Sequence, residues 1–343
     1  MTDLLVVSDD RHARHDPPHE VNLGRRVAPV WERPARIDAL RSGLGDGEMV
    51  AAEPHGDERL LAVHDQGLVT FLSEAYTSWR DSGGPEVMIP DTFPIPRLRD
   101  GGRESPSALG NVGWWCFDTA TPVVAGSYEA ARAAVDVALT AADRVADGAP
   151  LAYALTRPPG HHAGRDYYGG FCLFNAAAVA AQRLTEGGRV AVLDIDYHHG
   201  NGTQDIFWSS DDVLYVSLHA EPGAAYPYFT GFADETGQGA GRGWNRNLPL
   251  PRDTDDDAYL DTLDNAIDEL DGRDIATLVV SLGFDTYRHD PIGGFDLSRE
   301  CYGRIGRRIA DTGLPTVLIQ EGGYDLDSLG PNLATLIGGL TNA

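Results

Sequence analysis

The chain has 343 residues and a mass of 36.9 kDa, with 42% hydrophobic and 23% charged residues. This composition excludes a disordered, collagen-like or coiled-coil protein, and the length is sufficient for one or two globular domains. The 52 acidic residues outnumber the 27 basic ones, all of which are arginine, and give a net charge of -25. A biased genome or a salty cytoplasm would explain the excess of acidic residues. A protein with this net negative charge also repels nucleic acid and attracts cationic ligands. We therefore expect no nucleic-acid partner.

The sequence predicts a cytoplasmic protein with no membrane partner. No apolar run reaches the roughly 20 residues that span a bilayer. The N-terminus lacks the basic start and the long apolar segment of a signal peptide. The three cysteines, Cys116, Cys172 and Cys301, are an odd number without metal-type pair spacing. They fit a reducing compartment better than a disulfide framework.

Apolar runs alternate with helical patterns along the chain. Six runs are nearly continuous in apolar character, which is typical of strands buried on both faces of a parallel sheet. In chain order the expected strands are Leu4–Ser8, Leu151–Leu155, Val190–Asp194, Val213–Leu218, Thr277–Leu282 and Thr316–Gln320. The expected helices are Tyr128–Ala146, Leu173–Glu186, Asp256–Leu270, Ser298–Thr312 and Asn332–Leu340. The alternation predicts a single doubly wound α/β domain over residues 1–343, with a mostly parallel central sheet and helices on both faces.

Two segments interrupt this alternation and are expected to be long loop insertions. Gly83–Asn111 is rich in Pro, Gly and Arg, and Glu221–Arg252 is rich in Gly and aromatic residues. Loops of this length in a compact domain usually form lids, pocket walls or contact surfaces, although a flexible surface insertion is the alternative. The aromatic residues of the second segment favour a packed role, because they need a surface to bury against.

The motif LDIDYHHGNGTQD, at Leu193–Asp205, follows a buried strand directly. Asp196 and His198 are two positions apart, so both side chains point to the same side if the chain leaves the strand in an extended conformation. Asp285 follows the strand Thr277–Leu282 in the same way. Carboxyl ends of parallel strands are where ligands bind, and two Asp with one His leave an open coordination position for water on zinc. The pattern therefore predicts a hydrolytic zinc site, with a solvated strand-end loop as the alternative.

Two adjacent histidines follow another expected strand, in RPPGHHA. His161 and His162 suggest an acid/base pair for amide chemistry near neutral pH, although a structural histidine bonded to a carbonyl is the commoner case. Asp194 is the candidate carboxylate partner that would orient one of the rings.

QEGGYD, at the end of an expected strand, and GGFCLFN each add an aromatic residue that follows a pair of glycines. Tyr324 follows two glycines that allow close approach of substrate to backbone, and its phenol would donate to a developing oxyanion. Alternatively it covers a helix start. Phe171 would wall a narrow tunnel or pack against the helix that follows.

These motifs together resemble the arginase-like deacetylase superfamily, which comprises the histone deacetylases and their bacterial relatives. RPPGHHA, GGFCLFN, DIDYHHGNGTQ, SLGFD and EGGYD match in order across Arg157–Asp325, and ERPARI and VHD extend the match toward the N-terminus. Asn201 resembles the class II enzymes. The segment GNVGWWC and the loop YPYFTGFADETGQGAG most resemble the bacterial acetylpolyamine amidohydrolases.

The resemblance implies specific roles. Zinc would be held by Asp196, His198 and Asp285, while His161 and His162 would be the tandem acid/base histidines, with His162 as general base. Tyr324 would stabilise the oxyanion. The residues at the substrate would be Gly170, Phe171, Gly323 and Trp115. The resemblance also implies potassium beside the zinc, at Asp194, Asp196, His198, Ser217 and Leu218, and at a second site at Phe207, Ser210 and Val213.

Two departures bear on the substrate. Trp115 stands where histone deacetylases carry an Asp that binds the peptide backbone, and Leu109 stands where acetylpolyamine enzymes carry a Glu. Glu104 would replace that Glu from the same loop. We expect deacetylation of small cationic N-acetylated amines such as acetylpolyamines, by a homodimer that buries Tyr226 and Phe229 across its interface.

Three alternatives remain beside this hypothesis. The same chemistry would serve a lysine deacetylase that acts on acetylated proteins or peptides. An arginase-like ureohydrolase with two manganese ions would need further Asp and His ligands in place of the tyrosine motif. A non-enzymatic acyl-ligand binding module would be expected to lack Tyr324 or one of the tandem histidines, all of which are present.

Overall fold

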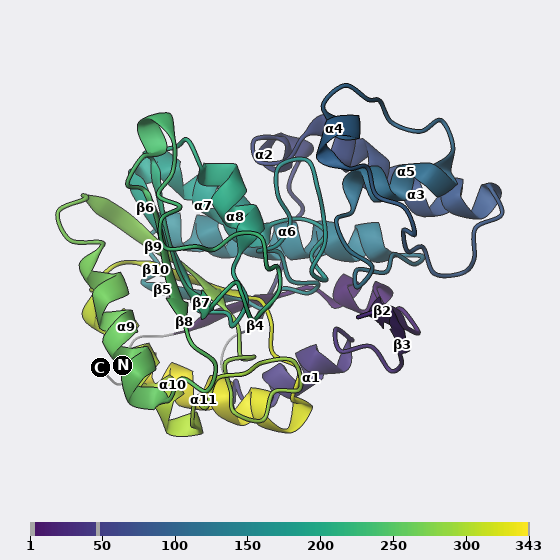
Figure 1. The fold of residues 1–343 in the computed structure, drawn as a ribbon. Helices are drawn as coiled ribbons and strands as arrows, with labels where there is room; N and C mark the ends of the chain where they lie inside the picture. Colours follow the sequence, from purple (N-terminus) through teal and green to yellow (C-terminus); the bar gives the residue numbers. More distant parts are fainter. Residues whose placement is uncertain (1–3, 46–48, 342–343) are drawn as a thin grey trace.

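The computed structural model describes residues 4–45 and 49–341. Within them, eight strands form one sheet in the order β4-β1-β5-β10-β9-β6-β7-β8, and each neighbouring pair is parallel (Figure 1). In that order the strands are Met49–Ala51, Leu5–Ser8, Leu151–Ala154, Thr316–Gln320, Ile275–Leu282, Arg189–Asp194, Val213–Ala220 and Asn245–Leu250. A separate antiparallel pair is formed by β2 (Glu20–Asn22) and β3 (Arg25–Val27).

Helices cover both faces of the sheet. One face packs against α3 (Gln66–Asp81), α5 (Ala108–Trp115), α6 (Ser127–Ala146) and α7 (Ala176–Leu184). The other packs against α1 (Ala35–Arg41), α9 (Asp256–Asp268), α10 (Arg299–Asp311) and α11 (Leu326–Thr341). The short helices are α2 (Asp57–Leu61), α4 (Pro96–Arg99) and α8 (Asn201–Phe207). Along β6, Val190 and Val192 enter the first core, and Ala191 and Leu193 enter the second, as the two-residue period of a strand requires.

The expected fold class is therefore confirmed: every expected strand and helix is present. Several bounds differ from those expected, most of all the starts of two helices. Helix α7 begins at Ala176 because the Asn175 side chain caps it, accepting from the amide of Ala178 at 2.9 Å. Helix α11 begins before Pro331, although a proline usually marks a helix start or break.

The expected loops at 83–111 and 221–252 contain regular structure, which corrects that expectation. The first includes α4 and the start of α5. The second ends in β8, an edge strand whose polar sequence NRNLPL lacks the apolar signature of a buried strand. An edge position also tolerates Pro249. In α5, a Cβ at Gly113 would lie 1.8 Å from the carbonyl oxygen of Thr92, so this glycine allows the helix to pack against the preceding segment.

Four adjacent strands, β5, β10, β9 and β6, end at the same edge of the sheet, and the loops that follow them carry the motifs singled out above. This edge is where ligands bind in open parallel sheets. Among the described residues, no helix is both long and apolar enough to cross a membrane.

Candidate active site

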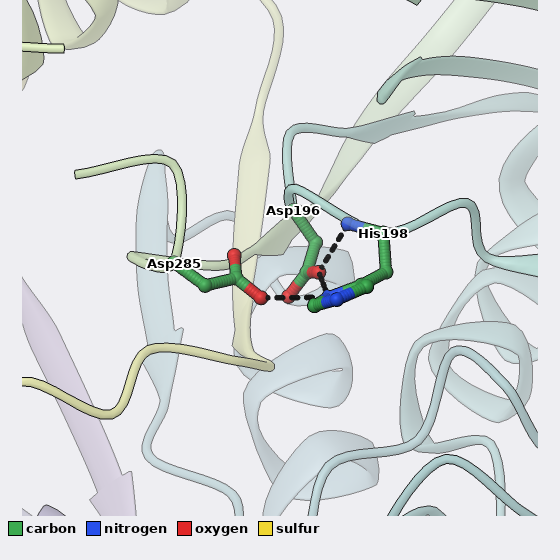
Figure 2. Close-up of side chains that lie close together, drawn as sticks. All are labelled: Asp196, His198 and Asp285. Atoms are coloured by element: carbon green, nitrogen blue, oxygen red, sulfur yellow. Dashed lines mark hydrogen bonds and ion pairs between the residues drawn. The ribbon is translucent and has the colours of Figure 1, made fainter. Parts of the chain in front are cut away.

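Asp196, His198 and Asp285 meet at this edge, as their positions after β6 and β9 predict (Figure 2). The Nδ1 atom of His198 lies 3.0 Å from Oδ2 of Asp285 and 3.5 Å from Oδ1 of Asp196. One ligand atom from each residue lies within 4.8 Å of the others. Two carboxylates and one imidazole are the donor set of a catalytic zinc with an open position.

The electrostatics of the triad also fit a bound cation. Asp196 and Asp285 are buried side by side. Burial, and then the charge of Asp196, raises the pKa of Asp285 to about 7. A divalent cation between the two carboxylates would offset both effects.

Two glycines allow backbone to pack directly against these carboxylates. A Cβ at Gly283 would lie 2.2 Å from Oδ2 of Asp196, and one at Gly322 would lie 2.5 Å from the same atom and 2.6 Å from Oδ2 of Asp285. Instead, the amide of Gly322 donates to Asp196 at 2.8 Å. Gly283 of SLGFD and Gly322 of EGGYD are thus explained by their close approach to the carboxylates of Asp196 and Asp285.

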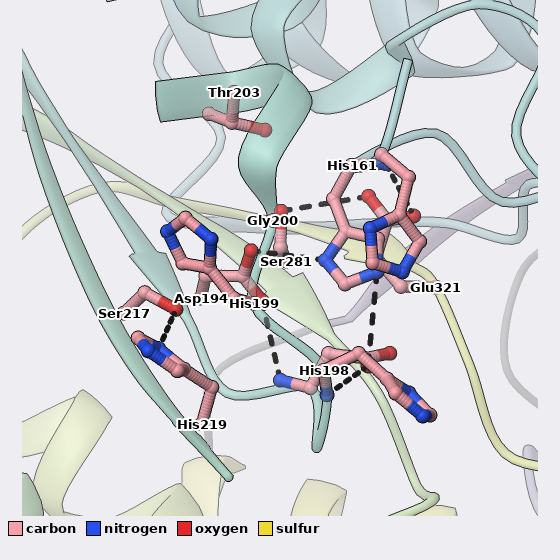
Figure 3. A network of polar contacts seen from close by, with 12 residues as sticks. His161, Asp194, His198, His199, Gly200, Thr203, Ser217, His219, Ser281 and Glu321 are labelled. Atoms are coloured by element: carbon pink, nitrogen blue, oxygen red, sulfur yellow. Dashed lines mark hydrogen bonds and ion pairs between the residues drawn. The ribbon is translucent and has the colours of Figure 1, made fainter. Parts of the chain in front are cut away.

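The tandem histidines lie beside the triad, with ring centroids 4.1 Å apart. Nδ1 of His161 is 3.1 Å from Oδ2 of Asp194, the partner expected from the sequence, as Figure 3 shows. Nδ1 of His162 is instead 2.7 Å from the side-chain oxygen of Asn201. The two adjacent rings therefore have different partners, one a carboxylate and the other a neutral amide.

Because their surroundings differ, the two rings have different pKa values. Burial by itself lowers the pKa of His161, but the charges of Asp196 and Asp194 raise it to about 10. Burial, and then the neighbouring charge of His161, holds the pKa of His162 well below its usual range. At neutral pH one ring holds a proton and the other can accept one, which suits general acid and base roles.

Tyr324 packs against Arg36, whose guanidinium carbon lies 4.8 Å from the centre of the phenol ring. Arg36 also donates to the carbonyls of Gly323 and Glu321, at 2.6 and 2.5 Å. Burial raises the pKa of the Tyr324 phenol well above its usual range, so the group is a proton-bearing donor. Within the described residues its hydroxyl forms no hydrogen bond. No role for Arg36 was expected from the sequence, because 287 positions separate it from Gly323.

Phe171 and Gly170 line the same site. The Phe171 ring packs edge-on against Tyr324 with centroids 5.6 Å apart. A Cβ at Gly170 would lie 2.3 Å from the ring of His162, so only glycine allows this approach.

Tyr226 is the main departure from the expected site. Its ring lies 5.0 Å from that of His162 and 6.2 Å from that of His198, and its hydroxyl donates to Asp118 at 2.8 Å. The ring of Tyr226 thus faces His162 and His198 of its own chain, a place in the site that the sequence did not indicate. Packing of Tyr226 across a subunit interface stays a prediction. Phe229 is 90% exposed and stays available for such a contact.

Trp115 and Glu104 are hydrogen-bonded to each other. Trp115 is 5% exposed and stacks on Phe71, and its indole nitrogen donates to Glu104 at 3.2 Å. Trp115 is thus part of the core on this face of the sheet, and its contact with substrate stays a prediction. Glu104 is exposed and also accepts from Asn111 at 2.7 Å, while Leu109 is 43% exposed.

The residues expected to bind potassium fall into two groups. Asp194 and Ser217 face each other across β6 and β7, and the Ser217 hydroxyl lies 2.8 Å from Nδ1 of His219. Phe207 ends α8 and Ser210 lies in the turn that follows it, where the amide of Ser210 donates to the Phe207 carbonyl at 3.0 Å. Potassium at either position stays a prediction.

A parallel α/β sheet with an Asp-His-Asp cluster, tandem histidines and a tyrosine at its strand ends defines a hydrolase of the arginase/deacetylase-like class. The histone deacetylase domain matches residues 28–340, and the chain belongs to the histone deacetylase family.

Similarity to acetylpolyamine enzymes extends over almost the whole chain. Acetylpolyamine amidohydrolase 1 of Pseudomonas aeruginosa is 43% identical over 345 residues, covering 99% of each protein. Acetylpolyamine amidohydrolase of Mycoplana ramosa is 39% identical, covering 98% of this chain and 99% of its own. The crystal structure of acetylpolyamine aminohydrolase from Burkholderia pseudomallei superposes with a TM-score of 0.93 at 38% identity, over 98% of both chains.

Proposed function

We propose that this protein is a zinc-dependent amidohydrolase that removes acetyl groups from small N-acetylated amines such as acetylpolyamines and releases acetate. The observation that carries the proposal is the convergence of Asp196, His198 and Asp285 with the tandem histidines and Tyr324. Full-length relatives that are named for acetylpolyamines support the substrate class.

Each polar side chain has a separate task in this proposal. A zinc ion held by Asp196, His198 and Asp285 would supply Lewis acidity to the amide carbonyl and the attacking water. Neutral His162 accepts the proton of that water, and Asn201 orients its ring. His161, charged and held by Asp194, keeps a proton near the leaving amine. The free hydroxyl of Tyr324 donates to the oxyanion of the tetrahedral intermediate.

The preference for a cationic amine rests on charge. The net charge of -25 draws cationic chains toward the protein. Glu104 adds a local carboxylate, which Asn111 and Trp115 hold in place. In this proposal Glu104 receives the distal ammonium that Leu109 cannot bind.

Three further features complete the proposal. Potassium binds at the two positions named above. A homodimer forms through the aromatic residues exposed on the 221–252 segment: Tyr228, Phe229 and Phe232. The enzyme works in the cytoplasm, where its three free, buried cysteines stay reduced.

The test is acetate release by the purified, zinc-loaded protein from three substrates: N-acetylputrescine, N-acetylspermidine and an acetyl-lysine peptide with flanking residues on both sides. We expect kcat/KM for the two polyamines to exceed that for the peptide. A higher value for the peptide would support a lysine deacetylase instead. No acetate from any of them would favour a non-enzymatic acyl-binding protein.

A further inference from the structure

Asp290, which none of the motifs above includes, is a buried carboxylate that joins two turns of the active site. Its Oδ2 atom accepts from the amide of Tyr324 at 2.6 Å and from that of Asp325 at 3.3 Å. Its Oδ1 atom accepts from the amides of Ile292 and Gly293, at 3.0 and 3.2 Å. One oxygen is therefore bonded to the carboxylate's own turn, and the other holds the backbone of the tyrosine that is expected to bind the oxyanion.

The segment that carries Asp290 starts at Asp285, the expected zinc ligand. The amide of Tyr287 donates to the carbonyl of Phe284 at 3.2 Å, and the amide of Asp290 donates to the carbonyl of Tyr287 at 2.9 Å. A Cβ at Gly293 would lie 1.9 Å from the carbonyl oxygen of Asp285, so the segment folds back onto its own start. The carboxylate of Asp290 therefore has a fixed place relative to the metal cluster.

The turn that carries Tyr324 needs to be held from outside, because two glycines precede the tyrosine. Gly323 has a left-handed backbone with φ of 111°, and glycine has more backbone freedom than any other residue. The carbonyl of Asp325 accepts from two amides in the first turn of α11. Amides at a helix start have no partner within the helix, and a carboxylate there is also favoured by the helix dipole. Asp290 supplies that carboxylate from a different segment.

We propose that Asp290 is a positioning residue that fixes where Tyr324 presents its phenol relative to the metal cluster. The inference rests on the proposed amidohydrolase function, in which this hydroxyl donates to the oxyanion, and adds the group that holds the donor in place. An oxyanion donor is effective because it is preorganised, and a misplacement of about 1 Å can slow a reaction by about 100-fold. Within the described residues, the side chain of Asp290 forms hydrogen bonds only to the four amides named above. Its effect on the reaction should therefore pass through Tyr324.

The test is a double-mutant cycle of Asp290→Asn and Tyr324→Phe, with kcat and KM measured on N-acetylputrescine and on an acetyl-lysine peptide. Asparagine has one acceptor oxygen, so it keeps only one of the two pairs of bonds. We expect Asp290→Asn to lower kcat by about 10- to 100-fold with little change in KM, because the lost interaction acts in the transition state. In the Tyr324→Phe background the same substitution should change kcat by less than about 2-fold, because the hydroxyl that Asp290 positions is already absent.

A second variant separates the position of the carboxylate from its charge. Asp290→Glu keeps the charge and both oxygens but displaces them by one methylene, so it should also lower kcat only where Tyr324 is present. The matched control is Asp255→Asn, which alters an exposed carboxylate that caps α9 by accepting from the amide of Ala258 at 3.0 Å. Loss of a helix cap should lower its Tm but leave kcat unchanged. Zinc content and Tm are measured for every variant.

Two results would overturn the positioning role. An equal loss of kcat in both backgrounds would show that Asp290 acts on the metal ligands or on the fold as a whole. A kcat within about 2-fold of wild type in both Asp290 variants, with normal zinc content, would show that the bond to Tyr324 is not needed. If neither variant folds, hydrogen exchange in the wild-type protein decides. The amide hydrogen of Tyr324 should exchange slowly, and rapid exchange would show that Asp290 does not hold this turn.

The two substrates separate this inference from the proposed function. A wild-type enzyme that hydrolyses only the peptide overturns the polyamine substrate, and the cycle measured on the peptide still decides the role of Asp290. No hydrolysis of either substrate overturns the proposed function itself. Exchange of the Tyr324 amide hydrogen then still shows whether Asp290 holds the turn.

Discussion

The floor and the rim of the active site are built differently. On the floor, Asp196 and Asp285 are buried, and backbone amides donate to both. By the rim we mean Glu104 and Phe229, which the proposal assigns to the amine and to a second subunit; Glu104 is exposed and Phe229 is 90% exposed. Groups held rigidly in a buried site act strongly on the reacting atoms, whereas exposed charges are screened by water and salt. The contrast implies that the floor determines the reaction and the rim adjusts which amine is accepted.

Removing a metal ligand from the floor should have the largest effect. Asp285→Ala should lose zinc and activity together, because a site with three protein ligands has no spare one. Metal content by mass spectrometry and acetate release measure the two quantities. Full zinc occupancy in this variant would remove Asp285 from the site.

Tyr324→Phe should leave the metal in place but slow turnover. Loss of one preorganised oxyanion donor typically lowers kcat by about 10²- to 10³-fold. Steady-state kinetics on N-acetylputrescine, with zinc content as the control, measures this. Near-normal kcat would show that the phenol has another role.

Gly322→Ala tests whether the floor depends on the close approach of backbone. The added Cβ would meet both carboxylates at 2.5–2.6 Å, so we expect weaker zinc retention during dialysis against a chelator and a lower Tm. Gly56→Ala is the matched control, since a Cβ added at Gly56 would have no atom within 4 Å. Equal zinc retention in the two variants would contradict the packing argument.

At the rim, Glu104→Gln should have the smallest effect. An exposed charge pair contributes little, so KM for N-acetylputrescine should rise by about 2- to 5-fold with kcat unchanged. The effect should shrink as salt is raised. The control is Glu74→Gln, an exposed carboxylate on α3. An equal rise in KM in both variants would assign the preference to overall charge rather than to Glu104.

Residues that directly follow a buried strand could be predicted from sequence. Asp196, Asp285 and Tyr324 each come after an apolar run, and parallel strands bring such positions to one edge. The fold was predictable for the same reason, since its strands are apolar and its helices alternate with them. Strand β8 was not, because it is a polar edge strand.

Contacts between residues that are far apart in the sequence could not be predicted, because they have no local sequence pattern. Asp118 meets Tyr226 across 108 positions, and neither residue follows an apolar strand. Trp115 also illustrates the limit: its place in a family motif did not indicate that it packs in the core.

Zinc titration of the metal-free protein tests the central claim most directly. Zinc is added in steps, and acetate release from N-acetylputrescine is measured at each step. We expect no activity without metal and a maximum at one zinc per chain, because Asp196, His198 and Asp285 together offer one set of three ligand atoms. Full activity in the absence of metal, or a maximum only at two ions per chain, would contradict it.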